Sequence, residues 1–320
     1  MRRVVLCAVA AASAACARAE PRPTPDVQAA HAPLAPSPKE PAGGHERGRS
    51  SARVYGAWEG FGFPGCAMIA PADDRDRDRD RDREELDVLF HFHAGQMSDR
   101  ELRATGLDGV IVSCGWGIGT APYARAFADP SRFDRMLAAA VRKAGGTRAG
   151  RLALASWSAG FASIGKILSQ PRHFAKTDAV VLLDSLHTAH DASGAPDVRM
   201  LDVFVRFARE AAAGEKLMVV THSAIPTAGY ASSTEATRAL LGAIDVPTHE
   251  SASDGEATFG GMRVRSRSDI RDLHVRGFHG VGARDHLDHL HLIGEVSRFW
   301  LVPRWRTEGT LVYTAAGEKR

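Results

Sequence analysis

The sequence predicts an α/β fold with a mostly parallel central sheet that helices cover on both faces. Five short runs rich in Val, Leu and Ile alternate with stretches of helical periodicity, which indicates βαβ units. The runs are continuously apolar rather than alternating, as is typical of strands buried on both faces. The expected strands are 86–92, 109–113, 151–155, 179–183 and 216–221, with a last one within 270–278, and the expected helices are 130–144, 159–168, 197–213, 233–244 and 285–301.

The composition is that of a globular protein with room for a large hydrophobic core, since the chain has 320 residues. Hydrophobic residues make up 44% and charged residues 25% of it, which excludes wholesale disorder and a polytopic membrane protein. Three of the 41 Lys and Arg residues lie within residues 1–19, so the rest of the chain carries 38 basic and 38 acidic residues. A nucleic-acid binder usually shows a basic excess, and we therefore expect no nucleic-acid partner.

The N-terminus predicts export from a bacterial cell. Two arginines precede an apolar run over residues 4–16, which is too short to span a bilayer and has the size of a signal-peptide core. Two processing routes stay open for a signal peptide at 1–19. One is cleavage after the A-x-A sequence at 17–19, and the other is lipid attachment at Cys16, which would tether the chain to a membrane. The segment before Cys16 resembles a bacterial lipoprotein signal, although Ser13 stands where Leu is usual. The product would be periplasmic, outer-membrane-anchored or secreted.

Two segments of biased composition flank or interrupt the expected domain. Residues 20–53 are rich in Pro, Ala and charge and predict a disordered tether. A single domain is expected over 54–320, with a low-complexity insert at 73–85 whose charges alternate in sign, as in a solvated loop or helix face. Cys66 and Cys114 are the cysteines that follow the signal. An oxidising compartment would allow them to pair, but two free buried thiols are equally compatible with the sequence.

The motif Ser156-Trp157-Ser158-Ala159-Gly160 lies between an expected strand and an expected helix. A nucleophile on such a tight turn needs small residues two positions before and after it, and Ser156 and Gly160 meet that need. The turn would expose the Ser158 hydroxyl above the sheet and place the Ala159 amide at a helix N-terminus, where it could bind an oxyanion. The alternative is that Ser158 only caps the following helix.

In this setting the motif resembles the nucleophile elbow of the α/β-hydrolase superfamily, over roughly residues 86–301. The resemblance implies a three-layer architecture and a Ser-His-acid mechanism. The tripeptide His93-Ala94-Gly95 is similar to the oxyanion-loop dipeptide of that superfamily, so Ala94 and Gly95 would complete the oxyanion hole with Ala159. Two features depart from the superfamily pattern. Ser156 replaces the commoner Gly, and no acid directly follows the strand that ends near Thr221.

The acid and the base are assigned by their places in the chain. Asp184 stands at the tip of the strand after the elbow, an acid position that some superfamily members use, and Asp245 and Asp254 are reserve candidates. A carboxylate there can hold an imidazole in the tautomer that accepts the serine proton. The resemblance implies a base early in the last helix, where Asp285 is expected as the N-cap and His286 as the first helical residue. His289 is the alternative base.

These residues together predict an exported serine hydrolase that cleaves an ester, or less readily an amide, through an acyl-enzyme on Ser158. His93, Trp157 and Trp116 are expected to line its pocket. The expected partner is a small-molecule or polymer-borne ester, and the mechanism needs neither a cofactor nor a metal.

Two other classes of function stay open. His91 and His93 on one strand face, with His286 and His289 on one helix face, could bring four imidazoles to a metal ion in a metal-dependent hydrolase. The H-E-x-x-H pattern of many zinc hydrolases is absent from the sequence. The third possibility is a tethered, non-catalytic binding module built on the same fold.

Overall fold

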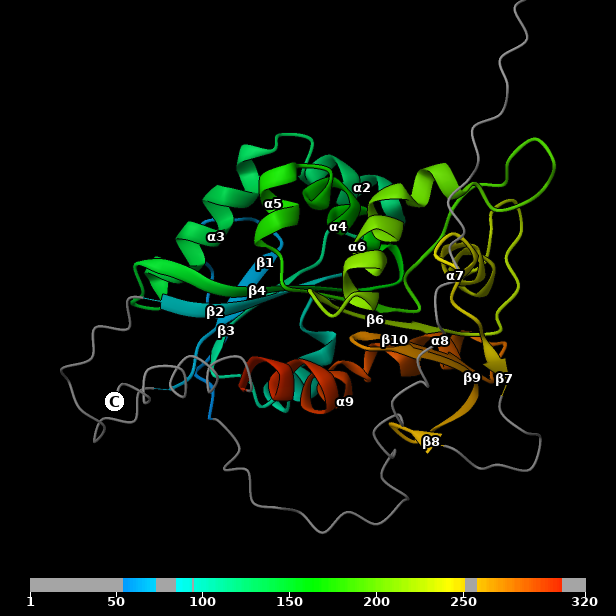
Figure 1. Cartoon of the computed structure of the whole chain (residues 1–320). Coiled ribbons are helices and arrows are strands. Elements are labelled where there is room, and N and C mark those ends of the chain that lie inside the picture. Colours follow the sequence, from blue (N-terminus) through cyan, green and yellow to red (C-terminus); the bar gives the residue numbers. More distant parts are fainter. Residues whose placement is uncertain (1–53, 73–84, 94, 251–257, 307–320) are drawn as a thin grey trace, which may run out of the picture. The chain divides into compact units, whose positions relative to one another are not determined.

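A mixed ten-stranded sheet forms the centre of the computed structural model, which describes residues 54–72, 85–93, 95–250 and 258–306 (Figure 1). The strand order is β1-β3-β2-β4-β5-β6-β10-β9-β7, and β8 pairs with β9. The strands are β1 (Cys66–Ile69), β2 (Glu85–Phe92), β3 (Gly109–Cys114), β4 (Arg148–Trp157), β5 (Ala179–Leu183), β6 (Leu217–His222), β7 (His249–Glu250), β8 (Thr258–Phe259), β9 (Met262–Ile270) and β10 (Leu273–Phe278).

The middle of the sheet is parallel, which confirms the predicted fold class. Strands β3, β2, β4, β5, β6 and β10 pair in parallel, whereas β1 pairs with β3, and β9 with β10, in the antiparallel sense. The six parallel strands therefore end at one common edge of the sheet. In such sheets ligands bind beyond the carboxyl ends of the strands, so the connections that follow β2, β4, β5, β6 and β10 are the ones that can build a site.

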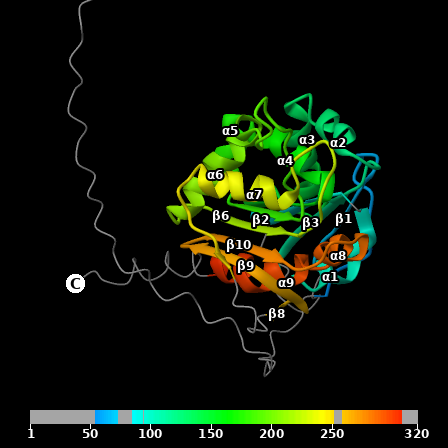
Figure 2. The same cartoon turned by 90° about the vertical axis from the view of Figure 1, so that its right-hand side faces the viewer.

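The helices form two layers, one on each face of the sheet (Figures 1 and 2). Helices α2 to α7 cover one face, and α1, α8 and α9 cover the other. They are α1 (Asp99–Arg103), α2 (Thr120–Ala126), α3 (Ser131–Lys143), α4 (Phe161–Leu168), α5 (Pro171–Lys176), α6 (Asp202–Ala212), α7 (Ser233–Gly242), α8 (Ala283–Leu290) and α9 (Ile293–Val296). Among the described residues, no helix has both the length and the apolar character needed to cross a bilayer.

Each face of the sheet has its own hydrophobic core, because neighbouring strand residues point to opposite faces. Val88 and Phe90 pack in the core under α3 and α6, whereas Leu89, between them, packs in the core under α9. All three side chains are fully buried, and each stabilises the fold by about 1.5–3 kcal/mol through removal from water. Burial on both faces explains why these strands appear in the sequence as unbroken apolar runs.

A disulfide joins Cys66 to Cys114, which settles the pairing that the sequence left open. The two residues face each other across the antiparallel pair of β1 and β3. The bond therefore ties the edge strand to the parallel part of the sheet. It also fixes the end of β3 at the edge where the parallel strands end.

The structure corrects the expected helix over 285–301. This segment divides into α8, α9 and a π-helical turn at Ser297–Leu301. The sequence also did not predict the short strand β1 or the antiparallel strands β7, β8 and β9. The expected signal and tether lie outside the described residues, as does the insert apart from Glu85, which begins β2.

Candidate active site

Ser158 lies on a sharp turn between β4 and α4 and has a left-handed backbone, with φ of 50°. Such a conformation costs a non-glycine residue on the order of 1–3 kcal/mol and persists only where its surroundings enforce it. Gly160 explains how the turn closes, since a Cβ atom there would lie 2.3 Å from the Phe92 carbonyl oxygen. The Cβ of Ser156 would lie 2.9 Å from the same added atom. A serine is thus accommodated at 156 because residue 160 has no side chain.

The Ser158 side chain lies at the surface of the turn without a protein partner among the described residues. The residue is partly exposed, and its hydroxyl makes no hydrogen bond with any residue in the described ranges. The Ala159 amide follows in the first turn of a short 3₁₀ helix, Ser158–Gly160, that leads into α4. Amides at this position lack intrahelical acceptors, so the Ala159 N–H is available to an anion beside Ser158.

Asp184 follows β5 and is also held in a left-handed conformation, with φ of 45°. Its side chain is buried, and the Oδ1 atom accepts hydrogen bonds from the Ser223 amide at 2.9 Å and from the Ser233 hydroxyl. Burial by itself raises the pKa of Asp184, but the hydrogen bonds from His286 and Ser233 outweigh it. The net pKa lies below the usual range of an aspartate, so this carboxyl is ionised at neutral pH.

His286 is the residue that the structure brings to Asp184. Its Nδ1 atom lies 2.6 Å from Asp184 Oδ2. Because an ionised carboxylate is only an acceptor, Nδ1 carries a proton, and in the neutral form of the imidazole the unshared pair is on Nε2. The imidazole remains partly exposed, with 26% of its side chain accessible. A partly exposed imidazole with a fixed Nδ1 partner is the arrangement required of a general base.

The start of α8 differs from the sequence prediction. The N-cap is Gly282 rather than Asp285, and α8 begins at Ala283. The Asp285 carboxylate lies one turn into the helix and accepts the Gly282 amide at 2.8 Å. His286 is consequently the fourth residue of the helix, not the first. The earlier start was not predicted because Gly282 offers no side chain to recognise as a cap.

Trp157 connects the serine turn to His286. Its indole Nε1 donates to the His286 carbonyl oxygen at 2.8 Å, and the two rings lie 4.6 Å apart. Since Trp157 immediately precedes Ser158, this pair of contacts places α8 against the serine turn. The indole also stacks on the His93 ring, with the ring centroids 5.0 Å apart. The sequence predicts Trp157 as a pocket residue, and the structure shows that it also bridges the serine turn and α8.

The alternative base, His289, is fully buried and lies away from solvent. Its Nδ1 bonds the Thr221 hydroxyl at 2.8 Å, and that hydroxyl also accepts the Asp184 amide at 3.2 Å. Burial is the main cause that lowers the pKa of His289 to about 4. His289 is therefore neutral at physiological pH and supports the turn that carries Asp184.

The loop after β2 is held by Tyr123 of α2. His93 has a left-handed φ of 76°, and its Nδ1 lies 2.6 Å from the Tyr123 hydroxyl. The same hydroxyl accepts the Trp116 amide at 3.0 Å and donates to the Gly117 carbonyl at 3.1 Å. Trp116 itself packs against the rings of Phe92, Tyr123 and Phe127.

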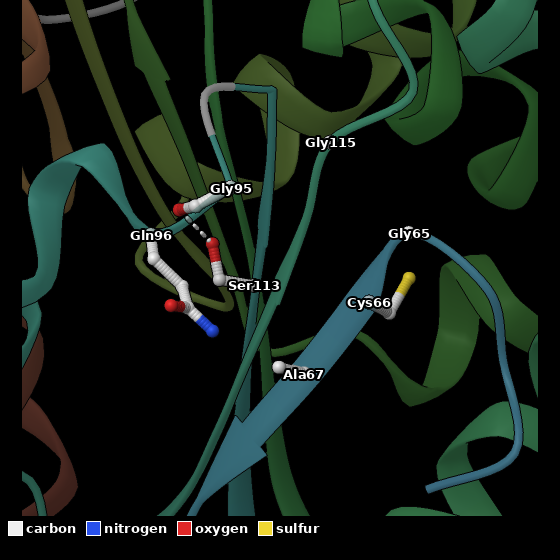
Figure 3. Close-up of a pocket in the computed structure, with 7 residues that line it drawn as sticks. All are labelled: Gly65, Cys66, Ala67, Gly95, Gln96, Ser113 and Gly115. Atoms are coloured by element: carbon white, nitrogen blue, oxygen red, sulfur yellow. Dashed lines mark hydrogen bonds between the residues drawn. The ribbon is translucent and has the colours of Figure 1, made fainter. Parts of the chain in front are cut away.

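The other residue of the expected oxyanion loop that the structure describes is Gly95, and Ala94 lies outside the described residues. The Gly95 carbonyl accepts the Ser113 hydroxyl at 2.5 Å. Gly95 also lines a pocket of about 380 Å³ at the ends of β1 and β3 (Figure 3). The lining carries no charged side chain and consists of Gly65, Cys66, Ala67, Gly95, Gln96, Ser113 and Gly115.

The four histidines considered for a metal site do not form one. In the described part of the chain, no group of three or more His, Cys, Asp or Glu residues is arranged to hold a metal ion. His91 lies within β2, fully buried, and burial lowers its pKa to about 3. The left-handed turn at His93 ends the strand alternation on which the shared face was predicted.

Among the described residues, neither reserve candidate for the acid makes a contact with His286. Asp245 is exposed in the turn after α7, and Asp254 lies outside the described residues. Sequence reasoning missed Tyr123 and Ser233, because nothing local marks a hydroxyl that meets its partner only in the folded chain. Ser185 was missed as well, although its place directly after Asp184 at a strand end was a usable signal.

Comparisons with known proteins give likenesses among solved structures only. No family model and no curated protein matches the chain. An S-formylglutathione hydrolase from Staphylococcus aureus has 12% identity and a TM-score of 0.45, over 78% of this chain and 97% of that one. The fluorophosphonate-binding serine hydrolase FphF of the same organism has 13% identity and a TM-score of 0.46, over 78% and 98%.

A thermostable esterase from Pseudomonas putida is also similar, with 14% identity, a TM-score of 0.40 and coverage of 74% of this chain and 78% of that one. All three are described as esterases or hydrolases. At identities of 12–14%, these likenesses concern the fold and not the chemistry.

Proposed function

We propose that this chain is a serine hydrolase that cleaves carboxylic esters through an acyl-enzyme on Ser158, in the manner of the α/β-hydrolase superfamily. One observation carries the proposal. The hydrogen-bonded pair of His286 and Asp184 lies against a strained, partly exposed serine turn, to which Trp157 joins it directly. Strained left-handed residues are typical of functional sites, and here two of them, Ser158 and Asp184, follow adjacent strands.

The proposed reaction has two halves. The Ser158 oxygen attacks the ester carbonyl while Nε2 of His286 takes the hydroxyl proton, and Asp184 stabilises the imidazolium that forms. The imidazolium then gives the proton to the departing alkoxide, and the C–O bond breaks to leave the acyl-enzyme and an alcohol. Water attacks the acyl-enzyme by the same route, with His286 again as the base, and releases the acid.

Backbone amides would stabilise the negative charge that develops on the carbonyl oxygen. The Ala159 amide is directed by the helix start, and we propose that the loop of Ala94 and Gly95 supplies the second donor. One such donor raises kcat by a factor of about 10²–10³. The uncharged pocket beside Gly95 suits a neutral part of the ester, so small neutral esters are the proposed substrates. Esters carried on a polymer remain compatible with the partly exposed site.

Export is part of the proposal. The Cys66–Cys114 disulfide supports it, because disulfides persist in oxidising compartments and are rare in the cytosol. We propose that residues 1–19 direct export and that Cys16 is a candidate for lipid attachment. The mass of the mature N-terminus distinguishes the routes. An acylated Cys16 shows lipid attachment, an N-terminus at residue 20 shows signal cleavage, and an intact Met1 would contradict export.

Hydrolysis of 4-nitrophenyl acetate tests the proposed chemistry. Ser158→Ala and His286→Ala should each lower kcat by several orders of magnitude, whereas Ser169→Ala, an exposed serine at the end of α4, should leave it unchanged. Addition of EDTA should not affect the rate. Activity that survives Ser158→Ala but is lost with the chelator would replace this proposal with a metal-dependent one. A folded protein with no activity on any ester would favour a binding module.

A further inference from the structure

The structure places a buried hydroxyl against the back of the serine turn. Ser185, directly after Asp184, donates its hydroxyl proton to the Ser158 carbonyl oxygen at 2.7 Å. The Ser185 oxygen also lies 2.7 Å from the hydroxyl oxygen of Ser156. Both Ser185 and Ser156 are fully buried, so water does not compete for these bonds.

The direction of this chain of bonds follows from counting protons. A serine hydroxyl has one proton to donate, and Ser185 gives its proton to the Ser158 carbonyl. The bond between Ser156 and Ser185 must therefore be donated by Ser156. The order is Ser156 hydroxyl, Ser185 hydroxyl, Ser158 carbonyl, and each bond polarises the next, because hydrogen bonds in a chain strengthen one another.

The Ser158 carbonyl belongs to the same peptide unit as the Ala159 amide. This unit is planar and trans, so its C=O and N–H groups point in opposite directions. The hydrogen bond from Ser185 fixes the direction of the Ser158 carbonyl and consequently the direction of the Ala159 N–H. It also draws electron density toward the carbonyl oxygen and makes the N–H a stronger hydrogen-bond donor.

We propose that Ser185, assisted by Ser156, is a positioning residue that aims and strengthens the oxyanion-binding amide of Ala159. The proposal rests on the function proposed above, since it assigns a role within the same site. It also gives a reason for the serine at the first position of the motif. With glycine there, the Ser185 hydroxyl would lose its donor, while the missing Cβ of Gly160 leaves the room that Ser156 needs.

Ser185 should act on the transition state rather than on substrate binding. Ser185→Ala should lower kcat for a neutral short-chain ester about tenfold, a fraction of the loss expected for a complete oxyanion donor. KM should change less than about twofold, because the amide acts on charge that develops during the reaction. Ser156→Ala leaves the bond to the Ser158 carbonyl in place and should lower kcat by only about threefold.

A tetrahedral analogue separates this role from a structural one. Phenylboronic acid adds to a serine oxygen and presents a boron-bound hydroxyl where the oxyanion forms. For Ser185→Ala and Ser156→Ala, its inhibition constant should rise by the same factor by which kcat falls. Ser268→Ala is the matched control. Ser268 is also buried and donates to a backbone carbonyl, that of Pro247 at 2.8 Å, but it lies on β9. Both quantities should stay unchanged in this control.

Two results would overturn the proposal. One is an unchanged kcat in Ser185→Ala, and the other is a fall in kcat without a matching rise in the boronate inhibition constant. If Ser185→Ala does not fold, the fall in kcat and the rise in the boronate inhibition constant are compared in Ser156→Ala instead. Failure of the proposed function gives a different signature. In that case Ser158→Ala retains hydrolysis, and the boronate does not inhibit the wild-type protein.

Discussion

Replacement of Asp184 by asparagine should change the tautomer of His286 without changing the size of any side chain. Oδ1 of Asp184 accepts from two donors, the Ser223 amide and the Ser233 hydroxyl. In Asp184→Asn the amide oxygen must remain on that side, because an NH₂ group there would face two donors. The NH₂ group then takes the place of Oδ2, which lies 2.6 Å from His286 Nδ1.

An NH₂ group in that place can only donate, so Nδ1 of His286 must become the acceptor and its proton moves to Nε2. The nitrogen that should take the Ser158 proton then has no free electron pair. A triad aspartate replaced in this way costs about 10⁴-fold in kcat, which corresponds to about 5.5 kcal/mol of transition-state stabilisation. We expect a loss of that order, with little change in KM.

The assay is steady-state hydrolysis of 4-nitrophenyl acetate, with thermal unfolding measured on the same samples to verify the fold. Asp245→Asn is the matched control, because Asp245 is an exposed acid outside the site and its replacement should leave kcat unchanged. A kcat for Asp184→Asn within about tenfold of the wild type would refute the assignment of Asp184. A loss in Asp245→Asn instead would move the acid to that position.

Three further predictions concern the surroundings of the site. Trp157→Phe removes the 2.8 Å bond to the His286 carbonyl but keeps a ring, and kcat should fall about fivefold in the same ester assay. Burial lowers the pKa of His91 from 6.5 to about 3. Between these pH values the imidazole is protonated in the unfolded chain but not in the folded one. The free energy of unfolding therefore falls as the pH drops, by up to about 1.4 kcal/mol per pH unit. His91→Leu removes this pH dependence together with two buried ring nitrogens that have no hydrogen-bond partner. The urea midpoint of unfolding should therefore rise more at pH 5 than at pH 7. An equal change of the midpoint at both pH values would contradict this. The double substitution Cys66→Ser and Cys114→Ser removes a disulfide between residues 48 positions apart. It should lower the free energy of unfolding, measured in urea, by about 4 kcal/mol. A reductant should have the same effect on the wild type.

The parallel strands were predictable from the sequence because burial on both faces leaves an unbroken apolar run, as in Ala179–Leu183. The antiparallel strand β9 was not, because its burial alternates and its inward positions include Ser266 and Ser268 rather than large apolar residues. The four-residue strand β1 is too short for a pattern of its own. Its place is set by pairing with β3, which the sequence does not display.

The candidate site was predictable where the signal was local. Ser158 could be recognised because its small neighbours and the flanking strand and helix occur together in the sequence. Asp184 and His286 could be named from strand and helix ends, but their contact joins residues 102 positions apart, and only the folded sheet shows it. The support by Tyr123 and Ser185 depends on hydroxyl directions, which no sequence pattern reports.

Covalent labelling with a fluorophosphonate tests the central claim most directly. The reagent reacts fastest with a serine whose proton a neighbouring base removes, and peptide mass spectrometry identifies the modified residue. We predict a single modification at Ser158 and its loss in His286→Ala. A modification at another residue, or none on the folded wild-type chain, would contradict the account.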